Sequence, residues 1–91
     1  MTAPHEAPVN DRVLLSFDGR VLEVFGYVDA ARYHLREQPR LEIKPGRRPI
    51  LQIITRHGRR HNLPYDAELL PGLQALADEL ARWVRAEDGK N

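Results

Sequence analysis

Residues 13–25, VLLSFDGRVLEVF, decide the fold that the sequence predicts. Apolar residues alternate with others on both sides of the central Asp18-Gly19 pair, which is typical of two half-buried strands joined by a tight turn. Asp-Gly favours such a turn because its two central positions need positive backbone φ angles. A two-residue turn would pair Phe17 with Arg20. We expect one face of this hairpin to meet the core, and that face carries Val13, Leu15, Phe17, Leu22 and Val24.

The opposite face of this hairpin is only partly polar. An antiparallel sheet tolerates water on one face, but an uncovered apolar patch is suited to self-association. The sequence therefore predicts either a segment that covers this face or a homodimer. The residues concerned are Leu14, Ser16, Val21, Glu23, Phe25 and Tyr27.

Three more strands are expected before the C-terminal segment. Residues 41–44 and 50–55 are apolar and partly β-branched, and residues 60–63 follow a second tight turn. Residues 28–36 fit either a helical turn or a further strand. The pattern predicts a single antiparallel β-meander of about five strands.

The C-terminal segment predicts an amphipathic helix of roughly 15 residues, because its apolar side chains fall within about 160° of a helical wheel. A sheet with one apolar face needs a cover, and this helix supplies it. The fold class expected is therefore α+β: a meander covered by one C-terminal helix. The apolar arc consists of Leu69, Leu73, Leu76, Ala77, Leu80, Ala81, Trp83 and Val84.

This order of elements resembles the pleckstrin-homology-like (PH-like) domains, in particular short bacterial forms, over about residues 12–86. The resemblance rests on Phe17-Asp18-Gly19-Arg20, on RYHLR at 32–36 leading to residues 41–43, and on LPGL at 70–73 opening the helix. It implies a partial barrel from a seven-strand pattern, and an interaction module rather than an enzyme. Lipid-binding members place several basic residues in the first strand–strand loop. Here that loop is taken as Asp18-Gly19, so the resemblance does not predict phosphoinositide binding.

Length and composition indicate one small domain. The chain has 91 residues, 42% of them hydrophobic and 30% charged, with a net charge of +1. We expect a flexible tail over residues 1–11, a single domain over residues 12–88 and a frayed end over residues 89–91. No apolar stretch is long enough to span a membrane and the N-terminus lacks the pattern of a signal peptide, so a cytoplasmic location is expected.

The basic segment from residue 40 to residue 60 supplies the main candidates for a binding site. Arg47-Arg48 and Arg59-Arg60 would suit phosphates or acidic partners. They flank a strand of about eight residues, which separates the two pairs by roughly 26 Å. Two small patches are therefore expected rather than one groove, and a nucleic-acid complex is not. Tyr33 and His34, beside Arg32 and Arg36, are the best stacking candidates, and Tyr33 fits a core position equally well.

Catalysis and metal binding find little support in the sequence. The chain has no cysteine, so thiol catalysis and thiolate metal sites are excluded. His57 and His61 are too few for a structural zinc site, and no nucleophile motif or glycine-rich phosphate loop occurs. No enzyme, metal or cofactor is expected. Trp83, at the margin of the helical apolar arc, fits either a core position or an exposed anchor for a partner.

These observations predict a non-enzymatic protein-interaction module that binds another protein or a second copy of itself. The alternative is a small domain that binds nucleic acid or an acidic ligand through its arginine-rich loops.

Overall fold

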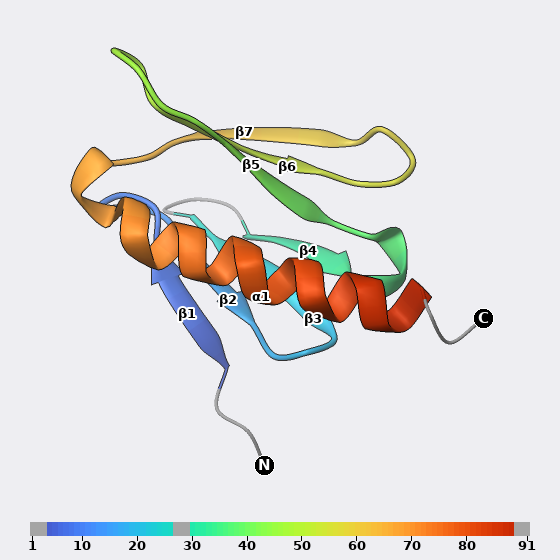
Figure 1. The fold of residues 1–91 in the computed structure, drawn as a ribbon. Coiled ribbons are helices and arrows are strands. Elements are labelled where there is room, and N and C mark those ends of the chain that lie inside the picture. The colour runs from blue at the N-terminus through green and yellow to red at the C-terminus, as the bar shows by residue number, and fades with distance from the viewer. Residues whose placement is uncertain (1–3, 27–29, 89–91) are drawn as a thin grey trace.

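The computed structural model describes residues 4–26 and 30–88, which form seven strands, two short 3-10 helices and one α-helix (Figure 1). A four-stranded antiparallel sheet has the order β1 (His5–Pro8), β2 (Leu14–Phe17), β3 (Val21–Phe25) and β4 (Ala30–His34). A three-stranded antiparallel sheet has the order β5 (Arg40–Lys44), β6 (Ile50–Ile54) and β7 (Arg60–Pro64). The helices are η1 (Leu35–Glu37), η2 (Ala67–Leu69) and α1 (Leu70–Asp88).

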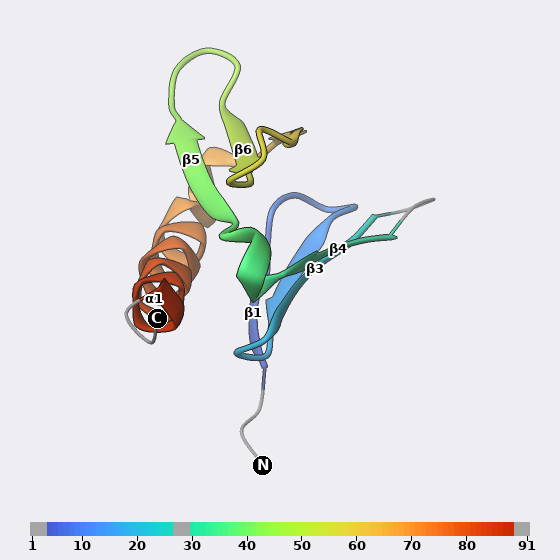
Figure 2. The same ribbon diagram turned by 90° about the vertical axis from the view of Figure 1, so that its right-hand side faces the viewer.

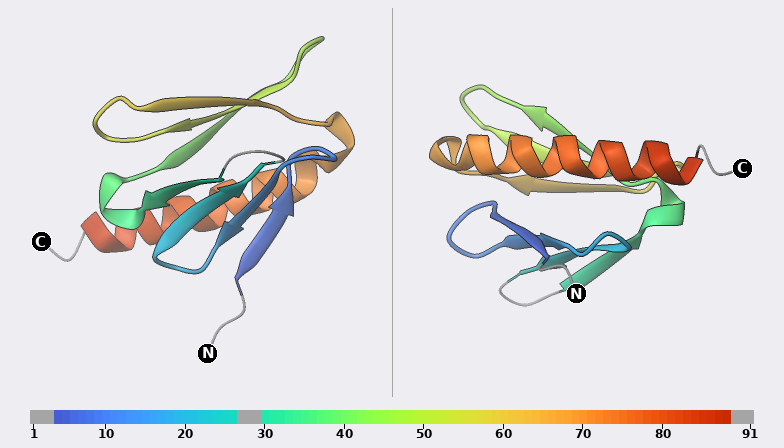
Figure 3. Two further views of the ribbon diagram at one scale, coloured as in Figure 1. Left: turned by 180° about the vertical axis from the view of Figure 1, so that it is seen from behind. Right: turned by 60° about the horizontal axis from the view of Figure 1, so that its bottom comes forward.

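Helix α1 runs across the opening between the two sheets (Figures 1, 2 and 3) and contacts β1 of one and β5 of the other. Leu73, Leu76 and Leu80 are fully buried in the same cluster as the inward residues of both sheets. The expected burial of these three leucines is confirmed, but the strands that α1 mainly contacts are β1 and β5 rather than those of the first hairpin. Within the described ranges, no helix combines the length and apolarity needed to cross a membrane.

The α+β class and the C-terminal helix are confirmed, but the single five-stranded meander is wrong. The chain forms two sheets because it leaves the first one after β4 through η1. Gln38 then takes a left-handed backbone conformation (φ 52°) and buried Pro39 follows, which has no N–H to donate to a ladder. Strand β5 therefore starts a new sheet instead of pairing with β4.

The flexible tail expected over residues 1–11 is corrected for its central part, because His5–Pro8 forms β1 and pairs with β2. Ala7 and Val9 are buried in the core, and His5 Nδ1 lies 2.7 Å from a carboxylate oxygen of Glu79 on α1. Pro8 is tolerated since it lies on an edge strand. The expectations for residues 1–3 and 89–91 fall outside the described residues.

The first hairpin has a longer turn than expected. Phe17 pairs with Leu22 rather than with Arg20, and the three residues from Asp18 to Arg20 separate β2 from β3. The Oδ1 atom of Asp18 accepts hydrogen bonds from the backbone N–H groups of Arg20 (2.8 Å) and Val21 (2.9 Å). The register moves by two residues, which leaves every side chain on its expected face because strands have a period of two.

In the ambiguous stretch from residue 28 to residue 36, the strand forms where the alternative was a helical turn over residues 29–32. Ala30–His34 is the strand β4, and the chain then makes the 3-10 turn η1 from Leu35. Residues 28 and 29 lie outside the described part of the chain.

The second face of the four-stranded sheet stays partly open to solvent. Leu14 and Val21 are half-buried, and Phe25 is 42% exposed. Strand register places Pro8, Leu14, Phe25 and Ala30 side by side in one apolar row across all four strands.

Candidate functional site

The arginines that the sequence analysis identified as binding candidates lie at separate places in the structure. Arg47 and Arg48 lie exposed at the tip of the β5–β6 hairpin, and Arg59 and Arg60 follow the opposite end of β6 (Figure 1). The two pairs do not converge on a common groove, in agreement with the separation that the intervening strand predicted.

Arg59 is engaged within the protein. Its Nη1 lies 3.2 Å from Oε1 of Glu37, and its guanidinium carbon lies 4.9 Å from the centre of the Tyr33 ring. Its backbone N–H donates to the Thr55 hydroxyl (3.2 Å). Arg59 thus ties the β6–β7 turn to η1 and β4, which is a structural role. Arg60 is exposed on β7 and takes part in none of the ion pairs among the described residues.

The stacking platform expected at residues 32–36 does not form. Tyr33 points into the core, where its hydroxyl lies 3.1 Å from His61 Nδ1, and burial raises its pKa above the usual value. Arg32 points to the other face of the sheet and pairs with Glu23 at 3.2 Å. His34 caps η1, where its Nδ1 accepts a hydrogen bond from the backbone N–H of Arg36 (3.3 Å).

The histidines do not assemble into a metal centre. Within residues 4–26 and 30–88, no group of three or more His, Cys, Asp or Glu side chains could hold an ion. His5 and His61 are each held by a partner on another element.

Trp83 is the most exposed large hydrophobic side chain of the described chain, at 46%. Its ring nevertheless has fixed neighbours. It stands edge-on against buried Phe17, with centroids 6.1 Å apart and an interplanar angle of 78°. It also covers Gly19, where a Cβ atom would lie 3.4 Å from the indole. The indole is therefore oriented by the β2–β3 turn while about half of it faces solvent.

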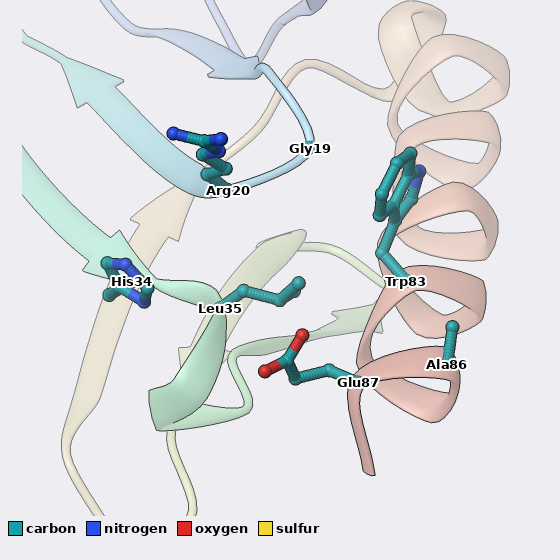
Figure 4. Close-up of a pocket in the computed structure, with 7 residues that line it drawn as sticks. All are labelled: Gly19, Arg20, His34, Leu35, Trp83, Ala86 and Glu87. Carbon is teal, nitrogen blue, oxygen red and sulfur yellow. The ribbon is translucent and has the colours of Figure 1, made fainter. Parts of the chain in front are cut away.

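Two hollows flank this indole. The first, about 400 Å³, lies between the β2–β3 turn, the β4–η1 junction and the end of α1 (Figure 4). In Figure 4, Trp83 stands opposite the Gly19-Arg20 turn, and Leu35 and Glu87 extend into the space below it. The second, about 220 Å³, is lined by Arg82, Trp83 and Ala86. We call the lining of both hollows the Trp83 surface: Gly19, Arg20, His34, Leu35, Arg82, Trp83, Ala86 and Glu87.

Sequence reasoning found only part of the Trp83 surface. His34 was a candidate for stacking, and Trp83 was left open between core and anchor. Its observed exposure favours the anchor. The position of Ala86, one helical turn after Trp83, could have signalled a small neighbour on the same helix face. The sequence could not predict that Gly19 and Leu35 line this site, because tertiary packing brings both residues close to Trp83.

Comparison of the chain with protein-family models, with curated proteins and with solved structures found no match.

Proposed function

We propose that this protein is a non-enzymatic protein-interaction module that binds its partner through the Trp83 surface. The observation that carries the proposal is a half-exposed tryptophan, held in orientation by Phe17 and Gly19 and flanked by two hollows. Tryptophan is enriched among the residues that dominate binding energy at protein interfaces. Because this ring is already positioned, binding would cost little further conformational entropy.

The chemistry of the larger hollow supports binding rather than catalysis. Its polar side chains are those of Arg20, His34 and Glu87, and no hydroxyl or thiol lines it. The hollow thus offers an aromatic wall with polar groups at its edge, which suits an apolar side chain of a partner and the polar chain around it.

The resemblance to PH-like domains also supports an interaction module. The resemblance implies seven strands before a C-terminal helix, and the described chain has seven strands followed by α1. The first strand–strand loop is residues 9–13 rather than Asp18-Gly19. Its single basic residue is Arg12, so the set of basic residues found in lipid-binding members is still missing.

A second copy of the chain is one candidate partner, and a different surface favours it. The row of Pro8, Leu14, Phe25 and Ala30 presents apolar side chains across four strands, with Phe25 42% exposed. Sedimentation at increasing protein concentration tests this, with Phe25→Ser expected to shift any dimer toward monomer. A wild-type chain that stays monomeric at the highest soluble concentration would exclude it.

The interaction role is tested by comparing partners that co-purify with the wild type, Trp83→Ala and Phe25→Ala chains. Trp83 and Phe25 are the two large hydrophobic side chains that are exposed in the described chain, so Phe25→Ala is a matched control for any partner other than a second copy of the chain. We expect a partner that is retained by wild type and Phe25→Ala and lost by Trp83→Ala.

Direct titration with that purified partner then provides a second measurement. Trp83 is the single tryptophan of the chain, and its emission should move to shorter wavelength when a partner without tryptophan covers the ring. Equal binding to Trp83→Ala, or an unchanged emission spectrum on binding, would contradict the proposal.

A further inference from the structure

One face of the three-stranded sheet carries charged and polar side chains that have no part in the proposed function. Strands β5, β6 and β7 turn alternate residues toward the core, among them Leu51, Ile53 and Leu63. Helix α1 and the four-stranded sheet both lie on that inner side (Figures 1 and 2). The residues of the opposite side, here called the outer face, form three cross-strand rows: Arg40, Ile54 and Arg60; Glu42, Gln52 and Asn62; Lys44, Ile50 and Pro64.

The charge of the outer face is positive. Arg40, Lys44 and Arg60 lie on it, and Arg56 lies two residues after the end of β6, against the single carboxylate of Glu42. The ion pairs found within the described residues involve none of these four cations. Their charges are therefore available to an anionic partner.

Two of these cations border a hollow of about 390 Å³. Ile54 and Thr55 line it and are themselves buried, Ile54 being only 6% exposed. Arg40 and Arg56 are its charged residues, and no carboxylate lines it. The nearest acid in sequence, Glu37, is engaged by Arg59 and by the backbone N–H of His34. The remaining lining residues are Gln38 and Val84 of α1, so the hollow extends from the outer face past the start of β5 to the helix.

Gln52 gives an independent indication of a ligand. It lies on the outer face two residues before Ile54, about 6.6 Å along the strand. Gln52 is only 9% exposed, and its Oε1 atom has no hydrogen-bond partner within the described chain. A buried acceptor without a donor is unfavourable, so a donor from a bound molecule would relieve it.

We propose that the outer face binds an extended acidic segment of a partner protein. A carboxylate of that segment would occupy the hollow between Arg40 and Arg56, where a guanidinium can hold it with two hydrogen bonds. A backbone N–H of the segment would donate to Gln52 Oε1 after this buried side chain turns outward. Ile50 and Pro64, which are half-buried and exposed respectively, would contact apolar side chains that alternate with the acidic ones along an extended chain.

A peptide fits this face better than a nucleic acid does. The outer face has no aromatic side chain on which a base could stack. The Glu42 carboxylate interrupts the positive charge, and a run of phosphates would have to pass it. Strand-like peptides, in contrast, supply N–H donors and carboxylates at the spacing of the sheet residues themselves.

The test uses the full chain and a fluorescein-labelled decapeptide of alternating Glu and Thr, followed by fluorescence anisotropy. The informative variant is Arg40→Ala/Arg56→Ala, and the matched control is Arg47→Ala/Arg48→Ala, which removes the same charge from the distant hairpin tip. We expect about a tenfold or larger loss of affinity for the first pair and a loss below about threefold for the second. Equal losses for both pairs, or no binding by the wild type at low ionic strength, would overturn the proposal.

Gln52→Leu separates binding from stability. Replacing the unpaired amide by an apolar group of similar shape should raise the thermal stability of the free chain and lower its affinity for the peptide. In the wild type, the side-chain NH₂ resonances of Gln52 should shift on titration. Unchanged resonances at saturation would overturn the assignment of the peptide to this face.

Two further arms distinguish this surface from the alternatives. A single-stranded oligonucleotide of equal charge should bind more weakly than the peptide, and tighter binding of the oligonucleotide would replace a peptide with nucleic acid as the ligand. Trp83→Ala should leave peptide affinity unchanged, because Trp83 lines neither the hollow nor the outer face. The inference therefore stands or fails independently of the proposed function.

Discussion

Truncation of the buried leucines of α1 should remove a large part of the stability of this protein. Leu76 and Leu80 are 0% exposed and lie in the cluster that joins both sheets to the helix. Leu76→Ala removes three carbon atoms, and at about 0.8 kcal/mol per buried methylene the transfer term alone is about 2.4 kcal/mol. The cavity left behind adds to this, so we expect each variant to cost about 3–5 kcal/mol.

This loss is large against the total. At about 0.05–0.15 kcal/mol per residue, a chain of 91 residues has an unfolding free energy of about 5–14 kcal/mol. Urea titration followed by far-ultraviolet circular dichroism measures the change, with the slope m expected to stay constant. Gln74→Ala, on the exposed side of the same helix, is the control and should change the free energy by less than about 0.5 kcal/mol.

A measured loss below about 1 kcal/mol for both Leu76→Ala and Leu80→Ala would refute the packing of α1 between the sheets. The two residues lie one helical turn apart and share the core cluster, so the double variant should not be additive.

Three smaller perturbations test the turn and the buried phenol. Gly19→Ala and Gly58→Ala both place a Cβ at positive φ (96° and 87°), and each should lower the free energy of unfolding by about 1 kcal/mol. Only the Cβ at residue 19 would approach the indole, so only Gly19→Ala should shift the fluorescence of Trp83. The same emission spectrum in both variants would contradict this contact. Backbone N–H groups of the β2–β3 turn hold the pKa of Asp18 below its usual 3.8. Its carboxylate therefore stabilises the fold above about pH 4 and loses this effect as pH falls through the lowered pKa. The stability difference between wild type and Asp18→Asn should shrink over that acid range, and a constant difference would exclude the effect. Burial raises the pKa of Tyr33 above its usual 10.0, so the folded state keeps a proton that the unfolded state releases, and stability should fall as pH rises above 10. Tyr33→Phe should show a smaller alkaline decline than the wild type in denaturant titrations, whereas identical declines would refute the assignment.

The local periodicity of the sequence was sufficient to predict which face of each of these strands, and of the helix, turns toward the core. Leu15, Phe17, Leu22 and Val24 are buried as the alternation predicted, although the pairing of the two strands is shifted by two residues from the expected one. The face was predicted correctly despite the wrong register because a shift by two residues leaves a strand's sides unchanged. The amphipathic helix was likewise readable, since its period of 3.6 is a property of neighbouring residues alone.

Strand β1 could not be predicted in the same way. The tetrapeptide His5–Pro8 has one apolar inward residue, Ala7, and its last three residues are all of types that are depleted in strands. It becomes a strand because β2 offers hydrogen-bond partners and α1 offers both an apolar contact and Glu79. These partners are distant in sequence, so no local pattern records them.

The sequence by itself determined the α+β class, the inward faces and the C-terminal helix, because these follow from the order of apolar and polar residues along short segments. Only the tertiary structure decided how the strands divide into two sheets, which of the arginines are engaged, and which residues surround Trp83. It placed Arg40 and Arg56 at one hollow and used Arg59 to hold η1. The physical reason is that a binding surface depends on contacts between segments far apart in the chain, and these contacts are chosen by packing of the whole core rather than by any local preference.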